Sequence, residues 1–235
     1  MQIDVIGFDA DDTLWQTEVH YLQAQRSLAK ILNQWEPEET INDILYQIEI
    51  NNLPHYGYGI KAFVLSMIET AIHISKGEIR GDQIEHILRI GQKMLAAEVI
   101  LQPHVRDTLK HVSTTYRLMI LTKGDLLDQT KKVKDSGLES FFFAVEIVSD
   151  KTPGTYAQIL NKYQVNPRNF LMVGNSIRSD VHPVLKLGGC AVYIPADTTW
   201  EHEIVPGFDT SQNGFYTLEH IGQLAELITR ISNAD

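Results

Sequence analysis

The sequence has little cysteine, no long apolar run and fewer basic than acidic residues. Its single cysteine, Cys190, excludes an internal disulfide and a zinc site built from several thiolates. No apolar run approaches the ~18 residues that a membrane-spanning helix needs, and the N-terminus lacks the basic segment of a signal peptide. These absences predict a soluble, cytoplasmic protein without a membrane partner.

The charge balance argues against a nucleic-acid partner. The 235 residues include 20 Lys and Arg against 30 Asp and Glu, which gives a formal net charge of −10. Such a surface repels a phosphate backbone, and the longest basic stretch, Lys131 to Lys134, is short. The length fits one large domain, or one medium domain that carries a smaller one.

Short apolar runs that alternate with helical patterns predict the fold class. Four of five such runs follow residue 115, and helical patterns such as Leu126 to Leu138 and Ser176 to Leu187 lie between them. The five expected strands are Ile3–Phe8, Arg117–Leu121, Phe142–Val148, Phe170–Val173 and Cys190–Ile194. This alternation predicts an α/β fold with a Rossmann-like parallel sheet and right-handed crossovers.

Residues 16–102 depart from this alternation. Four helical patterns follow one another there, and no strand-like run intervenes. We therefore expect an all-helical domain, 16–102, inserted after the first strand. The α/β domain is then discontinuous and consists of residues 1–15 and 103–235.

Polar side chains follow four of the expected strands. Ligands bind outside the carboxyl ends of the strands in open α/β sheets, so these side chains are expected to converge at one edge. The residues concerned are Asp9 and Asp11 after the first strand, Thr122 after the second, Lys151 after the third, and Asn175 and Asp180 after the fourth. Three carboxylates and a neutral amide form an oxygen-rich set that suits Mg²⁺ rather than zinc.

These residue types predict phosphoryl chemistry. A divalent cation lets Asp9 stay ionised and act as a nucleophile, while a protonated Asp11 donates to a leaving oxygen. Lys151 supplies a positive point charge and Thr122 a hydroxyl donor for a phosphoryl group. The backbone N–H groups of Lys123, Gly124 and Asp125 open a helix and could cradle an anion.

Four sequence motifs, taken in order, resemble the signatures of the haloacid dehalogenase (HAD) superfamily. The first is Asp-x-Asp-x-Thr after an apolar strand, here Asp9 to Thr13, and the second is a Thr that ends a strand, Thr122. Lys151, followed by Pro153, resembles the third, and Gly174 to Asp180 resembles the fourth. The resemblance extends over nearly the whole chain.

The resemblance implies a role for each motif residue. Asp9 is expected to form an aspartyl-phosphate, and Asp11 to act as general acid and base with its backbone carbonyl on the metal. Thr122 binds phosphoryl oxygens, Lys151 holds nucleophile and phosphate together, and Asp180 ligates Mg²⁺ with Asp9. The helical insert is similar to the family's C1-type cap, a lid that closes over the site and selects the substrate.

Two positions within the motifs discriminate among family reactions. Asn175 stands where relatives often carry an acid, so we expect it to hold a metal-bound water at lower metal affinity. Dehalogenases of the superfamily lack the second acid, Asp11, because a halide needs no proton to leave. We therefore expect a phosphatase for a small phosphorylated metabolite. Phosphomutase, phosphonatase or dehalogenase-type chemistry, or a non-enzymatic relative that binds a partner protein, are the alternatives.

The candidate substrate contacts lie near the motifs and in the insert. Thr13 belongs to the first motif, and Lys123 and Gly124 directly follow the second, although solvent exposure is the favoured reading of Lys123. In the insert, Tyr58 and Lys61 belong to a Gly- and Tyr-rich segment, 53–61, which reads either as a loop that reaches the substrate or as a packed turn between helices. Both a monomer and a dimer are compatible with the sequence.

Overall fold

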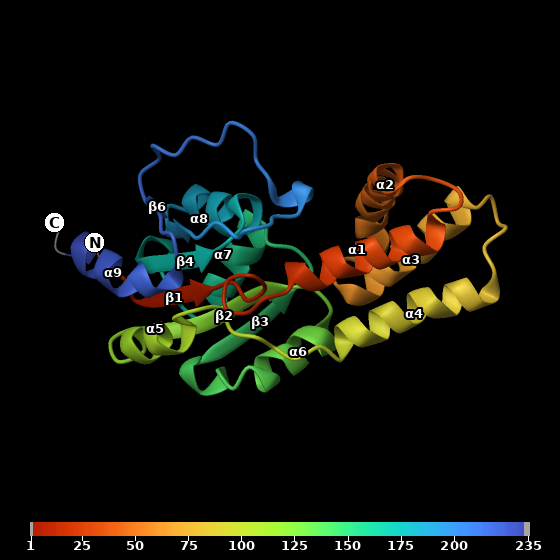
Figure 1. Ribbon diagram of the computed structural model, residues 1–235. Helices are drawn as coiled ribbons and strands as arrows, with labels where there is room; N and C mark the ends of the chain where they lie inside the picture. Colours follow the sequence, from red (N-terminus) through yellow and green to blue (C-terminus); the bar gives the residue numbers. More distant parts are fainter. Residues whose placement is uncertain (1, 233–235) are drawn as a thin grey trace. The chain divides into compact units, whose positions relative to one another are not determined.

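A parallel sheet forms the centre of the α/β part of the chain (Figure 1). Its strands are β1 (Val5–Phe8), β2 (Arg117–Lys123), β3 (Ala144–Val148), β4 (Phe170–Gly174), β5 (Cys190–Tyr193) and β6 (Phe215–Thr217). The computed structural model describes residues 2–232, and in this range the strand order is β3-β2-β1-β4-β5-β6 with every neighbouring pair parallel. The α/β, Rossmann-like prediction is confirmed. The order reverses between β1 and β4, the point where such sheets bind ligands.

Helices cover both faces of this sheet. They are α5 (Val105–Val112), α6 (Leu126–Asp135), α7 (Pro153–Lys162), α8 (His182–Lys186) and α9 (Leu224–Ser232). Successive side chains of a strand point to opposite faces. Ile6 and Phe8 of β1 accordingly share one core with α5, α6 and α9, whereas Val5 shares another with α7 and α8.

A second compact unit consists of helices α1 (Glu18–Leu32), α2 (Glu38–Tyr56), α3 (Ile60–Ile74) and α4 (Gly81–Leu95). It contains residues 17–98 and also 124–128, and the remaining residues form the α/β unit. Apolar residues of α3 recur at helical spacing, from Ile60 through Phe63 and Met67 to Ile74, and all are buried in a core of their own. Within residues 2–232, no helix combines the length and the apolar character required to cross a bilayer.

Four local features of the structure differ from the sequence-based expectations or were not predicted. Helix α2 continues to Tyr56, so the turn within segment 53–61 is only Gly57 to Gly59, and Lys61 belongs to α3. The expected helix over 176–187 is present, but its first part is a π-helix, Ile177–Val181, which the short α8 follows directly. The sequence patterns predicted neither helix α5 nor strand β6.

Candidate functional site

Asp9 lies at the carboxyl end of the central strand β1 and is buried. Its backbone N–H donates to the carbonyl of Val173 at 2.9 Å, which fixes the start of the loop against β4. The Thr13 hydroxyl lies 3.1 Å from Asp9 Oδ2 and 3.3 Å from Asn175 Oδ1, so it can donate to either. Two of the motif segments therefore meet at the point where the strand order reverses.

Lys151 joins the carboxylates of Asp9 and Asp180. Its Nζ lies 2.5 Å from Asp9 Oδ1 and 2.7 Å from Asp180 Oδ1, and the Lys151 and Asp180 side chains are each only 1% exposed. Burial raises the pKa of Asp9 to about 7; Lys151 opposes this rise and the charge of Asp180 adds to it. Burial would lower the pKa of Lys151, but Asp180 and Asp9 outweigh burial and hold it above its ordinary value. When all three groups are ionised, the cluster carries one net negative charge.

Glycine is required at the end of β4 because Asp180 packs against it. A Cβ built on Gly174 would lie 2.2 Å from Asp180 Oδ2 and 2.6 Å from its Cβ, both far inside van der Waals contact. The same Oδ2 accepts a hydrogen bond from the Ser176 backbone N–H at 3.0 Å. The Gly174 and Ser176 backbone therefore forms the seat that orients the Asp180 carboxylate.

The Asp11 carboxylate is held by three donors of the α/β unit. Trp15 Nε1 lies 2.8 Å and Lys132 Nζ 3.2 Å from Oδ1, and Gln129 Nε2 lies 2.7 Å from Oδ2. Gln129 is buried and also accepts from the Thr122 hydroxyl at 3.4 Å. One side chain of α6 thus links the first and second motifs.

Gln129 is a site residue that the sequence motifs do not include, although the sequence carries a signal for it. Helix 126–138 reads as polar-faced, and a glutamine among lysines does not stand out there. However, Gln129 precedes the apolar Val133 by four residues, so both point to the same side of the helix, and both are buried. The position of Gln129 on the same helix face as the apolar residues is therefore the signal that predicts its burial.

Lys123 forms an ion pair with Glu203, a residue that no sequence motif or periodicity predicted as part of the site. The Lys123 side chain is 17% exposed, and its Nζ also donates to Ser179 Oγ at 2.8 Å. Glu203 lies in a 3₁₀ turn, Glu201–Glu203, of the irregular segment between β5 and β6. Because the two partners are 80 residues apart and no strand or helix pattern connects them, sequence spacing carries no signal for this pair.

Tyr58, Lys61 and Gly124 belong to the helical unit. The Lys61 ammonium forms an ion pair with Asp125, 3.0 Å from Oδ1, and Gly124 has a φ of +139°, which favours glycine. Although burial would raise the pKa of Asp125, its bonds to Lys61 and to the Asp128 backbone N–H lower it. Within this unit, the loop after β2 is thus joined to the first turn of α3.

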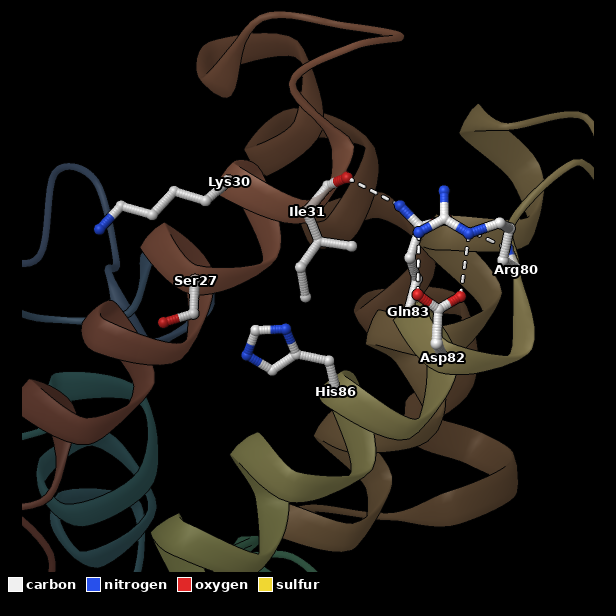
Figure 2. Close-up of a pocket in the computed structure, with 7 residues that line it drawn as sticks. All are labelled: Ser27, Lys30, Ile31, Arg80, Asp82, Gln83 and His86. Carbon is white, nitrogen blue, oxygen red and sulfur yellow. Dashed lines mark hydrogen bonds and ion pairs between the residues drawn. The ribbon is translucent and has the colours of Figure 1, made fainter.

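The helical unit also has a hollow between α1 and α4, with a volume of about 470 Å³ (Figure 2). Arg80 and Asp82 face each other across 2.9 Å on one side, and Gln83 donates to the Ile31 carbonyl at 3.5 Å. Its lining residues are Ser27, Lys30, Ile31, Arg80, Asp82, Gln83 and His86. None of the motif residues lines it.

The donor set at the strand ends suits a hard divalent cation. Within residues 2–232, no three acidic, histidine or cysteine side chains form a group that could hold a metal ion by themselves. The side-chain oxygens gathered there are the carboxylates of Asp9 and Asp180 and the amide oxygen of Asn175. Mg²⁺ commonly takes one or two carboxylates and completes its octahedron with water and substrate oxygens. With Asp9 ionised, the net negative charge of the Asp9–Lys151–Asp180 cluster also fits a cation.

Three comparisons with known proteins agree on the family. The family model described as haloacid dehalogenase-like hydrolase matches residues 3–183. A haloacid dehalogenase-like family hydrolase from Xanthomonas campestris has 33% sequence identity and a TM-score of 0.88 over 97% of this chain and 91% of that one. Human N-acylneuraminate-9-phosphatase is 23% identical over 80% of each chain. Glyceraldehyde 3-phosphate phosphatase from Pyrococcus furiosus is 22% identical over all of this chain and 96% of that protein.

Proposed function

Because the chain belongs to the haloacid dehalogenase-like hydrolases, we propose that it hydrolyses a small phosphomonoester through an aspartyl-phosphate at Asp9. The observation that carries the proposal is the buried Asp9–Lys151–Asp180 cluster at the strand ends. Burying two carboxylates around one ammonium is costly, and such arrangements concentrate at functional sites.

In the first step, Asp9 attacks the phosphorus in line with the ester oxygen. The new bond joins a carboxylate oxygen of Asp9 to phosphorus, the phosphorus–ester oxygen bond breaks, and Asp11 gives its proton to the leaving oxygen. Lys151 offsets charge on the phosphoryl oxygens, and the Thr122 hydroxyl turns its one proton from Gln129 Oε1 to them. Gln129 contacts both Thr122 and Asp11, so it fixes the position of the phosphate-binding hydroxyl relative to the general acid.

In the second step, water attacks the phosphorus of the aspartyl-phosphate. Asp11 takes the proton from that water, the Asp9–phosphorus bond breaks, and inorganic phosphate leaves. Both steps need Asp11 in one fixed orientation, which its bonds to Trp15, Gln129 and Lys132 provide.

Asp9, Asp180, Asn175 and the backbone carbonyl of Asp11 are the ligands we assign to Mg²⁺. Bound there, the ion supplies positive charge that lets an anionic ester approach an anionic nucleophile. Asn175 contributes no charge, so this site would bind the ion less tightly than one with a third acid.

We further propose that helices α1 to α4 act as a C1-type cap and that Tyr58 and Lys61 contribute to substrate selection, with Thr13, Lys123 and Gly124 as further candidate contacts. Two relatives are named for N-acylneuraminate 9-phosphate and glyceraldehyde 3-phosphate, which differ greatly in size. Both are phosphorylated metabolites with hydroxyl or carbonyl groups, and this is the substrate class that we assign.

A panel of phosphorylated metabolites with Mg²⁺ tests the proposal. It includes these two compounds, p-nitrophenyl phosphate and a 2-haloacid. Inorganic phosphate should be released by the wild type and by the matched control Asp12→Asn, but not by Asp9→Asn. Asp12 has a φ of +59°, which asparagine also tolerates. Full activity in Asp9→Asn would overturn the mechanism, and halide release without phosphate release would replace the phosphatase with a dehalogenase.

A further inference from the structure

The carboxylate of Glu203 accepts hydrogen bonds from three side chains beside the candidate site. Lys123 Nζ donates to Oε1, and the hydroxyls of Ser176 and Ser179 both donate to Oε2, the latter at 2.6 Å. The Glu203 side chain is only 11% exposed, and both serines are buried. An irregular segment between two strands thus places a charged group against the second and fourth motifs.

The directions of these hydrogen bonds are fixed by their donors. Ser179 Oγ accepts from the Lys123 ammonium at 2.8 Å, and Ser176 Oγ accepts from the Ser179 backbone N–H at 2.9 Å. An ammonium and an N–H group only donate, so each hydroxyl proton is left to point at Glu203. Burial would raise the pKa of Glu203, but Lys123 and the three hydrogen bonds lower it to about 2.

This network leads directly to Asp180. Ser176, whose hydroxyl binds Glu203, also donates its backbone N–H to Asp180 Oδ2 at 3.0 Å. Ser179 precedes Asp180 in the π-helical turn Ile177–Val181, and its carbonyl accepts from the Tyr156 hydroxyl at 3.0 Å. π-helical segments are rare and are often found at functional sites. The geometry of this turn therefore depends on a partner outside its own segment.

We propose that Glu203 is a positioning residue: it holds the Ser176–Asp180 turn and so sets the affinity of the site for a divalent cation. This inference rests on the proposed function, which assigns Asp180 to the metal. Lys123, which the sequence suggested as a substrate contact, belongs to this network. Groups that orient metal ligands usually change metal affinity about 10- to 100-fold when they are removed.

Mg²⁺ binding measured by isothermal titration calorimetry tests the inference without any substrate. Glu203→Ala should bind Mg²⁺ about 10- to 100-fold more weakly than the wild type, and the isosteric Glu203→Gln less severely. The control Glu201→Gln changes an exposed carboxylate of the same turn and should bind like the wild type. With p-nitrophenyl phosphate, saturating Mg²⁺ should restore the kcat of Glu203→Gln, and KM should change little.

The results distinguish a failure of this inference from a failure of the proposed metal site. If Glu203→Gln and Glu203→Ala bind Mg²⁺ as tightly as the wild type, the inference is wrong and the proposed function stands. If the wild type binds no divalent cation, both the metal assignment and the inference are overturned. If Glu203→Ala does not fold, as judged by circular dichroism, Glu203→Gln decides alone, since it keeps the shape of the side chain.

Discussion

The α/β unit and the helical unit bury different kinds of polar group. At its strand ends the α/β unit buries ionisable groups, Asp9, Lys151 and Asp180. The helical unit buries mainly neutral ones: Thr70 donates to the Ser66 carbonyl at 2.7 Å, and Asn52 donates to the Ser66 hydroxyl at 3.2 Å. Neutral groups can be satisfied by the local backbone, whereas buried charges cost stability unless each has a partner. The difference indicates that the α/β unit concentrates its costliest buried groups at the proposed site.

Removal of the central ammonium should have the largest effect. Lys151→Met leaves the Asp9 and Asp180 carboxylates without their shared cation. We expect phosphate release to fall on the order of 10³-fold and the free energy of unfolding at neutral pH to fall by about 3–5 kcal/mol. Steady-state kinetics and urea unfolding measure the two effects.

The matched control for this change is Lys93→Met, which removes an exposed lysine from α4 of the helical unit. It should change stability by less than about 0.5 kcal/mol and leave activity unchanged. Equal effects of the two substitutions would contradict the distinction between the units.

One glycine in each unit lies so close to a neighbouring side chain that an alanine would overlap with it, which allows a matched comparison of the two units. An alanine Cβ would lie 2.2 Å from Asp180 Oδ2 at Gly174, and 2.3 Å from Val64 Cγ2 at Gly91. Both Gly174→Ala and Gly91→Ala should lower the free energy of unfolding by about 1–3 kcal/mol. Only Gly174→Ala should also lower kcat, about 10- to 100-fold, because it displaces a proposed metal ligand. Comparable kcat losses in both variants would show that the clash acts through general destabilisation.

Loss of the link between Thr122 and Asp11 should have a smaller effect. Gln129→Leu keeps the volume but removes both hydrogen bonds. One to two lost hydrogen bonds of about 1 kcal/mol each correspond to a roughly 10-fold lower kcat, with KM nearly unchanged. Gln92→Leu, at an exposed position of α4, is the control and should have the kcat of the wild type. An unchanged kcat in Gln129→Leu would mean that Asp11 is oriented without Gln129.

The smallest expected effect is a pH-dependent change in stability caused by Glu49. This largely buried carboxyl is an exception in the helical unit, which otherwise buries mainly neutral polar groups. Burial and the nearby charge of Glu18 raise its pKa from 4.5 to about 8. From about pH 4.5 to 8 the folded chain keeps this proton and the unfolded chain loses it, so stability falls as pH rises through this window. Because the carboxyl is partly exposed, we expect its contribution between pH 6 and 8 to be on the order of 1 kcal/mol.

Unfolding midpoints from pH 5 to 8.5 measure this contribution. Glu49→Gln should lose less stability than the wild type as pH rises, whereas Glu39→Gln, an exposed change on the same helix, should follow the wild type. Parallel curves for Glu49→Gln and the wild type would show that Glu49 titrates normally.

The sequence predicts those parts of the α/β unit that continuous apolar runs mark. Apolar runs indicated the five strands β1 to β5 to within two residues at each end, because buried parallel strands are continuous apolar segments. The acids and Lys151 were found because each follows such a run. Strand β6 has three residues and follows a long irregular segment, so no periodicity marks it.

Gln129 and Glu203 show the limit of that reasoning. Their partners lie on other segments, and only the folded sheet brings them together. The helix predicted over 176–187 exists, but the π-helical form of residues 177–181 was not predicted, since its hydrogen bonds to Tyr156 and Glu203 are tertiary.

Covalent trapping at Asp9 tests the central claim most directly. During turnover of p-nitrophenyl phosphate with Mg²⁺, an acid quench preserves an acyl phosphate, and borohydride reduces it to an alcohol with loss of phosphate. Peptide mass spectrometry should then find homoserine in place of Asp9 and unmodified side chains at Asp11 and Asp180. Phosphate release with Asp9 unmodified, or reduction at another carboxylate, would contradict the account.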